Sequence, residues 1–159
     1  MSIRIDKIVT RGGDGGQTSL GDGSRVTKDD VRIEVLGTLD EINALVGLVQ
    51  AHTPAGDSIA QQLTAVQNLL FDMGADVCLP EDGPMAERAH RVEEAALLVL
   101  ERRIEELRAR QSPLNGFVLP GGSVPAAMAH MTRTQVRRAE RRMVALSRAE
   151  RVNPVLLKI

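Results

Sequence analysis

The chain has 159 residues, two phenylalanines, no tryptophan or tyrosine, and a formal net charge of −1. A domain of this size buries roughly 68–70% of its unfolded surface and needs no metal or disulfide to fold. Its single cysteine, Cys78, excludes a disulfide framework and a cysteine-rich metal site. The near-neutral charge and the scarcity of aromatic residues disfavour a nucleic-acid binder. The sequence shows no signal leader and no run of about 18 apolar residues, so we expect a cytoplasmic protein outside the membrane.

A glycine-rich segment, TRGGDGGQTSLGDGSRVTKDD, runs from Thr10 to Asp30. Glycines let backbone N–H groups approach phosphate oxygens, hydroxyl groups add donors, and Lys28 supplies a positive charge. The segment is not a Walker A loop, because no Gly-Lys-Ser/Thr ends it. Taken alone, it is either a phosphate-binding cradle or a solvated arm. We assign residues 1–30 to this segment and residues 31–159 to a helical bundle in the same domain.

Helical periodicity dominates the remainder, with helices predicted at about residues 30–53, 57–79, 85–111 and 123–149. Ordinary signals mark the ends of these helices: Asp29 or Asp30, Asp57 and Ser123 as N-caps, and Pro54, Gly56 and Pro80 as stops. The third helix is expected to bury one apolar stripe: Val92, Ala96, Val99, Leu100, Ile104 and Leu107. Long helices joined by short loops specify an all-α, up-down antiparallel bundle.

The fourth predicted helix carries arginines where a bundle helix usually carries leucines. Residues 133–151 hold seven Arg and two Glu, a local charge of +5. Arg133, Arg137 and Glu140 are spaced i, i+4 and i+7, so they share one face. A solvated face is the ordinary interpretation, but this helix must also supply core contacts, and a buried guanidinium needs an anionic partner. The candidate partners, within a chain or between subunits, are Asp40 and Glu41.

These motifs resemble those of the PduO-type ATP:cob(I)alamin adenosyltransferases, a family of corrinoid adenosyltransferases. The glycine-rich segment is similar to the family signature TRTGDxGxTSLxxGxRVxKDD, and GTLDEINALVG, FVLPGGS and HMTRTQVRRAER match later family motifs in the same order. The resemblance covers essentially the whole chain. It implies a homotrimer of helical bundles with active sites between subunits. It also implies transfer of the 5′-deoxyadenosyl group of ATP to the cobalt of reduced cobalamin, with release of tripolyphosphate.

The resemblance also implies the ligands and the residues that hold them. The ligands are ATP, Mg²⁺ and cobalamin, the last as a substrate. The nucleotide cradle falls on Thr10, Arg11, Gly12, Gly13, Thr18, Ser19 and Lys28 of one subunit, completed by Arg137, Arg138, Glu140 and Arg141 of its neighbour. Among these, Arg137 and Glu140 are the expected catalytic residues, and Glu140 is the side chain considered for Mg²⁺.

On the corrinoid side, the resemblance places Asp40 and Arg133 as an ion pair across the subunit boundary. Phe117 would lie at the lower corrin face, where an apolar ring excludes the axial ligand of cobalt and makes the metal easier to reduce. The alternative for Phe117 is an ordinary core residue between a loop and a helix.

The sequence departs from the family in two places. Gly12 stands where the family loop has a second threonine, which removes a hydroxyl near the phosphates. After NPVLLKI the family continues into a YLNRLSD motif and a last, fifth helix. Either the sequence is part of a longer chain, which we favour, or the protein lacks part of its nucleotide and metal site.

The enzyme is the favoured interpretation of three. The others are a cobalamin- and ATP-binding or delivery protein without turnover, and a helical module whose arginines bind RNA. As partners of the enzyme we expect a corrinoid reductase and a cobalamin-dependent mutase or dehydratase.

Overall fold

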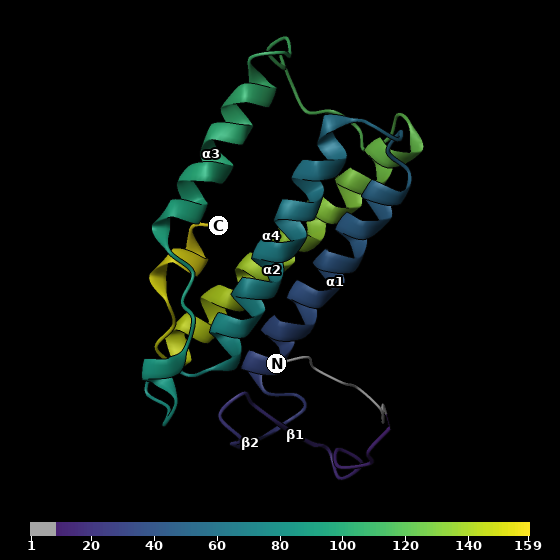
Figure 1. Cartoon of the computed structure of the whole chain (residues 1–159). Helices are drawn as coiled ribbons and strands as arrows, with labels where there is room; N and C mark the ends of the chain where they lie inside the picture. Colours follow the sequence, from purple (N-terminus) through teal and green to yellow (C-terminus); the bar gives the residue numbers. More distant parts are fainter. Residues whose placement is uncertain (1–8) are drawn as a thin grey trace.

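The computed structural model describes residues 9–159, which form a helical fold with one small hairpin (Figure 1). The α-helices are α1 (Val31–Ala51), α2 (Ser58–Cys78), α3 (Glu94–Arg108) and α4 (Val124–Ala149). Strands β1 (Gln17–Ser19) and β2 (Arg25–Thr27) pair antiparallel, and two short 3₁₀ helices, η1 (Ala86–Arg88) and η2 (Pro154–Leu157), complete the elements. The predicted helical fold with four α-helices is confirmed. The first eight residues of the predicted 1–30 segment lie outside the described residues.

The N-caps predicted from the sequence begin three of the helices. The Asp30 carboxylate accepts a hydrogen bond from the Arg32 N–H at 2.8 Å, and Asp57 accepts one from the Ile59 N–H at 2.9 Å. Ser123 caps α4, with a proline in the first turn. Each cap satisfies a backbone donor that the helix itself leaves unpaired.

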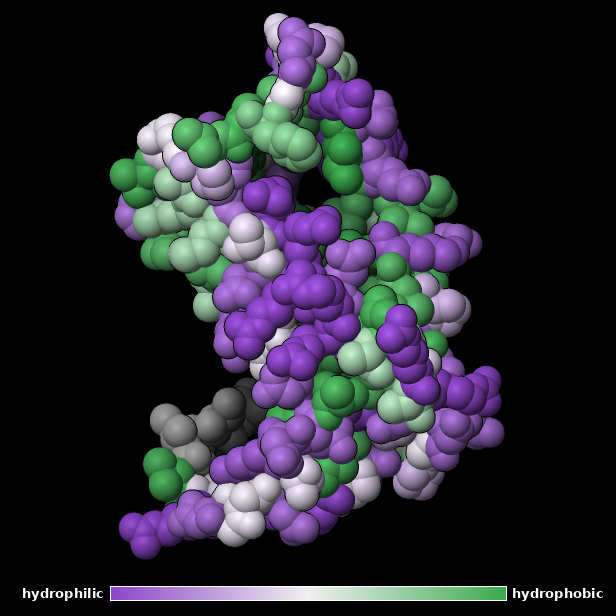
Figure 2. Space-filling view, turned by 180° about the vertical axis from the view of Figure 1, so that it is seen from behind, coloured by the Kyte–Doolittle hydropathy of each residue, from purple (hydrophilic) through white to green (hydrophobic). Residues whose placement is uncertain are grey.

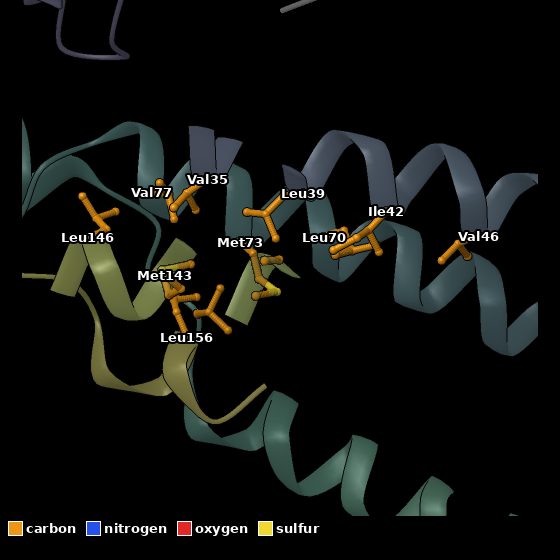
Figure 3. Packing of buried hydrophobic residues seen from close by; sticks show 12 residues of the cluster. Val35, Leu39, Ile42, Val46, Leu70, Met73, Val77, Met143, Leu146 and Leu156 are labelled. Carbon is orange, nitrogen blue, oxygen red and sulfur yellow. The ribbon is translucent and has the colours of Figure 1, made fainter. Parts of the chain in front are cut away.

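Helices α1, α2 and α4 pack around one shared core (Figure 3). The labelled side chains of the three helices point toward one another, and the 3₁₀ helix η2 adds one residue: Val35, Leu39, Ile42, Val46, Leu70, Met73, Val77, Met143, Leu146 and Leu156. Burying a side chain of this size contributes about 1.5–3 kcal/mol relative to leaving it exposed. The core therefore fixes the relative positions of α1, α2 and α4. It also determines which faces of these helices remain exposed.

Helix α3 differs from the prediction in its start and in its packing. It begins at Glu94, not near residue 85, and it stands apart from the other three helices (Figure 1). None of its residues is buried: Ile104 is 60% exposed and Val99 48%. These residues line a groove of about 700 Å³ opposite Ile59, Leu63 and Val66 of α2. Of the predicted stripe, Val92 is buried in the core just before α3 and Ala96 packs against the core. The expectation of burial is wrong for Val99, Ile104 and Leu107, because an apolar period identifies the face of a helix and not how closely a neighbour approaches it.

Within residues 9–159, none of the helices combines the length and the apolar character that a membrane span requires.

Candidate active site

The glycine-rich segment folds into a hairpin at the end of the bundle where α1 begins and α2 ends (Figure 1). Strand residue Thr18 pairs with Val26, and the Lys28 N–H donates to the Gly16 carbonyl at 2.9 Å. In the turn, the Ser24 hydroxyl and N–H donate to the Asp22 carboxylate at 2.6 and 2.9 Å, which lowers the pKa of Asp22 below its ordinary value. The described part of the segment is therefore an ordered hairpin whose residues are mostly exposed to solvent.

The exposed Arg25 side chain links two parts of the glycine-rich segment. Its guanidinium donates to the Gly12 carbonyl at 2.9 Å and to the Ser19 hydroxyl at 3.1 Å. The sequence did not assign Arg25 to the site, and its only signal there is its place within the segment. Two residues of the predicted cradle, Gly12 and Ser19, are thus linked by a side chain that the prediction omitted.

Two glycines of the predicted cradle differ in how much space surrounds them. A Cβ on Gly13 would lie 3.0 Å from the Lys28 ammonium group, so Gly13 lets the lysine side chain cross close to the backbone. A Cβ on Gly12 would meet nothing nearer than the Thr10 hydroxyl at 3.8 Å. Crowding therefore does not explain why Gly12 replaces the family's threonine.

The arginines of α4 are exposed in the single chain, so their face is not buried among the chain's own helices. The core face of α4 consists of Ala139, Met143 and Leu146, which leaves the charged residues on the other sides of the helix. Seen from behind, hydrophilic residues gather along the middle of the molecule, with hydrophobic residues exposed to either side (Figure 2).

The charged residues of α4 divide into two groups. Arg138 lies 3.9 Å from Glu41 and Arg142 lies 3.7 Å from Glu34, so both face α1. On the other side, no ion pair among residues 9–159 involves the three remaining arginines of interest: Arg133, Arg137 and Arg141. The Arg141 guanidinium donates to the Arg137 carbonyl at 2.8 Å, but within residues 9–159 this second group has no carboxylate partner, which suits the binding of an external anion.

The two predicted catalytic residues, Arg137 and Glu140, line the same groove of about 550 Å³. Its walls are apolar and come from α1, α2 and the last residues of the chain, among them Leu39, Met73 and Ile159. The structure therefore brings a guanidinium and a carboxylate to the edge of one apolar groove, as their i, i+3 spacing on the helix requires.

The remaining predicted site residues do not meet within one chain. Asp40 is exposed on α1, at a shallow groove of about 350 Å³ that includes Phe71 of α2, and no ion pair within the part of the chain described here joins it to Arg133. Phe117 is fully exposed in the connection between α3 and α4, which excludes the alternative of a core residue. That connection lies at the opposite end of the bundle from the hairpin (Figure 1).

Residues 8–159 match the protein family described as cobalamin adenosyltransferase. The chain belongs to this family and is a transferase. It is 40% identical over 153 residues to the cobalamin adenosyltransferase of Cupriavidus metallidurans, covering 96% of this chain and 79% of that one. It is 37% identical over 155 residues to the corrinoid adenosyltransferase of Bacillus subtilis, covering 96% and 78%.

Solved structures of family members agree with the fold. A variant of the PduO-type ATP:corrinoid adenosyltransferase from Lactobacillus reuteri, complexed with cobalamin and ATP, gives a TM-score of 0.88 at 34% identity and covers 96% of this chain and 84% of that chain. A second variant of that enzyme, complexed with ATP, gives a TM-score of 0.84 at 32% identity, covering 94% and 83%. The family assigned from the sequence motifs is confirmed.

Among the described residues, no group of three or more His, Cys, Asp and Glu side chains is arranged to hold a metal ion. Mg²⁺ commonly keeps one or two carboxylates and takes its other ligands from phosphate oxygens and water. The exposed Glu140 carboxylate, beside Arg137, can supply such a contact.

Proposed function

We propose that this member of the cobalamin adenosyltransferase family transfers the 5′-deoxyadenosyl group of ATP to the cobalt of cob(I)alamin. The electron pair of Co(I) forms the Co–C5′ bond, the C5′–O bond of ATP breaks, and tripolyphosphate leaves with that bonding pair. The products are adenosylcobalamin and tripolyphosphate. The observation that carries the proposal is the guanidinium face of α4, exposed and without carboxylate partners on one side, in a chain whose family handles ATP and corrinoid.

The protein needs no general base for this reaction, because the nucleophile is Co(I). Its residues have to align ATP and stabilise the negative charge that accumulates on the triphosphate. The hairpin supplies backbone N–H groups, hydroxyls and the Lys28 ammonium group. Helix α4 supplies Arg137 and Arg141 from its unpaired face and Arg138 from the side that faces Glu41. Mg²⁺, held by the phosphates with Glu140, would add a further positive charge at the leaving group.

The active site is proposed to form between subunits. The hairpin lies at one end of the bundle, and Arg137 lies along the side of α4, facing a groove of its own chain. No hydrogen bond or ion pair between the hairpin and the arginines of α4 is present in residues 9–159. A neighbouring copy can bring its α4 face to the hairpin, which is the arrangement that the family resemblance implies.

A homotrimer is therefore expected in solution. Static light scattering of the purified protein should give the mass of three 17.2 kDa chains at micromolar concentration.

Charge reversal by Asp40→Arg should weaken assembly or corrinoid binding, because Arg133 of the neighbour would then face a like charge in a partly desolvated site. The matched control is Asp72→Arg, another acidic residue exposed on a helix. A monomeric wild type would contradict the shared site.

On the corrinoid side, Phe117 is proposed to cover the lower face of the corrin. Its full exposure leaves the ring available to a ligand, and the connection that carries it, residues 109–123, ends in the N-cap Ser123. A cobalt without its lower ligand is easier to reduce to the Co(I) nucleophile. The proposed Asp40–Arg133 pair would lie next to the same ligand.

The proposed reaction is tested by turnover of chemically reduced cobalamin with ATP. We expect the absorption spectrum of adenosylcobalamin to appear together with one equivalent of tripolyphosphate. Binding of ATP and cobalamin without either product would instead establish a binding or delivery protein. RNA binding that weakens steeply with salt would favour the nucleic-acid alternative.

In the cell, a reductase must supply the Co(I) state, and an adenosylcobalamin-dependent mutase or dehydratase would use the product. We propose that the protein works beside such enzymes in the cytoplasm.

A further inference from the structure

The C-terminal end of α2 has an unusual set of partners. The last carbonyls of an α-helix have no intrahelical donor and must be satisfied from elsewhere. In the α2 terminal turn, defined here as residues 76–79, the carbonyls of all four residues accept hydrogen bonds from other parts of the chain. These donors belong to segments far away in the sequence.

Two adjacent carbonyls of this turn hold the glycine-rich segment. The Val77 carbonyl accepts from the Arg32 guanidinium at 2.6 Å, and the Cys78 carbonyl accepts from the Gly21 N–H at 3.0 Å. Gly21 lies in the hairpin turn, and Arg32 lies in the first turn of α1. Strand β2 and Lys28 lie between them in the sequence, so this part of the segment is fixed at both ends.

The turn itself is held firmly by the rest of the fold. The Asp76 side chain is only 1% exposed and accepts from the Arg91 guanidinium at 2.7 Å, the Val92 N–H at 2.8 Å and the Asn153 amide at 2.7 Å. Arg91 also donates to the Asp76 and Leu79 carbonyls, each at 2.8 Å. The α2 terminal turn is therefore a rigid support for anything bonded to it.

The presence of an arginine at position 32 is explained by its contact with the α2 terminal turn and not by its place in α1. A cation in the first turn of α1 is unfavourable for the dipole of that helix, whereas a cation at the C-terminus of α2 is favourable. Arg32 is 3% exposed, and its guanidinium also pairs with Glu150, the residue that follows α4. One buried side chain thus links the exit of the glycine-rich segment to the ends of α2 and α4.

A glycine at position 21 is explained by the close approach of the hairpin turn to the α2 terminal turn. A Cβ at this position would lie 3.1 Å from the Leu79 side chain and 3.3 Å from the Cys78 sulfur. Only a residue without a side chain lets the hairpin turn reach the Cys78 carbonyl without displacing these atoms. Neither Gly21 nor Arg32 belongs to the predicted phosphate cradle, so a role of theirs in catalysis would be indirect.

We propose that the α2 terminal turn anchors the glycine-rich segment, and that Gly21 and Arg32 are positioning residues that hold the hairpin and Lys28 in the conformation that receives the triphosphate. The inference rests on the proposed function for the identity of the ligand. The anchor itself is a property of the unliganded chain.

The variant Gly21→Ala tests the anchor, with Gly15→Ala as its matched control. Gly15 lies in the same segment, but a Cβ there meets nothing within 4 Å. In unliganded protein, hydrogen exchange of the Leu20 and Lys28 amides should accelerate in Gly21→Ala by about tenfold, the effect of losing one hydrogen bond of about 1.4 kcal/mol. Exchange in α1, and in the whole Gly15→Ala protein, should stay at the wild-type rate.

The link to ATP is tested by calorimetry and kinetics. Gly21→Ala should weaken ATP binding by about tenfold, which corresponds to 1.4 kcal/mol, and should leave the KM for cobalamin unchanged. Arg32→Met should raise the KM for ATP further, and Arg32→Lys should recover part of the loss, since a lysine can still reach one carbonyl. If the Arg32 variants do not fold, the Gly21→Ala and Gly15→Ala pair decides alone.

Wild-type exchange rates in Gly21→Ala would overturn the anchor. Faster exchange with unchanged ATP affinity would overturn its role in positioning. A wild-type protein that does not bind ATP would overturn the proposed function, and hydrogen exchange would then still decide whether the anchor exists.

Discussion

Replacing Arg137 by alanine should lower kcat/KM for adenosyl transfer by about 10²–10³-fold, the range measured when one preorganised donor to a developing negative charge is removed, roughly 2.7–4 kcal/mol. The leaving triphosphate gains charge in the transition state, and Arg137 is the residue of the α4 face that lines a groove beside Glu140. Because the Arg137 side chain is exposed and outside the core, helix content and trimer mass should not change.

The matched control for this variant is Arg142→Ala. Arg142 lies on the same helix and is 45% exposed, but its guanidinium faces Glu34 on α1. Its removal should cost less than about 1 kcal/mol of stability and leave turnover unchanged, as for an ordinary exposed ion pair. Wild-type kcat/KM in a folded Arg137→Ala protein, or equal losses in both variants, would contradict the assignment of Arg137.

Features encoded by neighbouring residues were predictable from the sequence. Asp30, Asp57 and Ser123 begin helices as N-caps because a cap acts on N–H groups two or three residues away. The presence of the helices was predictable for the same reason, since apolar periodicity along one segment is a local signal. These local signals were enough to predict four helices and, except for the start of α3, their approximate bounds.

Features that depend on distant segments were not predictable. The stripe on α3 gave no information on its distance from α2, so Ile104 and Leu107 were expected in the core and are exposed. The partners of Arg32 and Asp76 were also invisible, because their hydrogen bonds join residues 45 to 118 positions apart in one case and 15 to 77 in the other. No pattern along the chain signals which distant residue donates hydrogen bonds to the end of a helix.

The candidate site was predicted by a different route. Its residues were named by resemblance to the family, and the structure then shows where they lie. Gly13 lies beside Lys28, Arg137 lies beside Glu140, and Phe117 is exposed at the end of the bundle opposite the hairpin. The sequence left open whether the arginines of α4 find anionic partners within the chain or in another subunit. Within the chain they are not buried, because Ala139, Met143 and Leu146 supply the core contacts of that helix. The arginines are left to solvent or to another molecule.

Phe117→Ala is expected to retain the fold and the affinity for ATP but to lower turnover with cobalamin by more than about tenfold, or 1.4 kcal/mol in the barrier. The side chain is fully exposed, so its truncation leaves no cavity, and the melting temperature should not fall. If the ring displaces the lower axial ligand of cobalt, its loss leaves the metal five-coordinate and harder to reduce. The visible absorption of Co(II)-cobalamin bound together with ATP reports the coordination number directly.

The matched control is Leu114→Ala, a large apolar residue 76% exposed in the same connection between α3 and α4. It should keep both the wild-type turnover and the four-coordinate spectrum, because an apolar surface alone does not place a ring beneath the corrin. A four-coordinate spectrum that persists in Phe117→Ala would contradict the role proposed for the ring. A marked loss of thermal stability would contradict its exposure, since an exposed ring makes few contacts to lose.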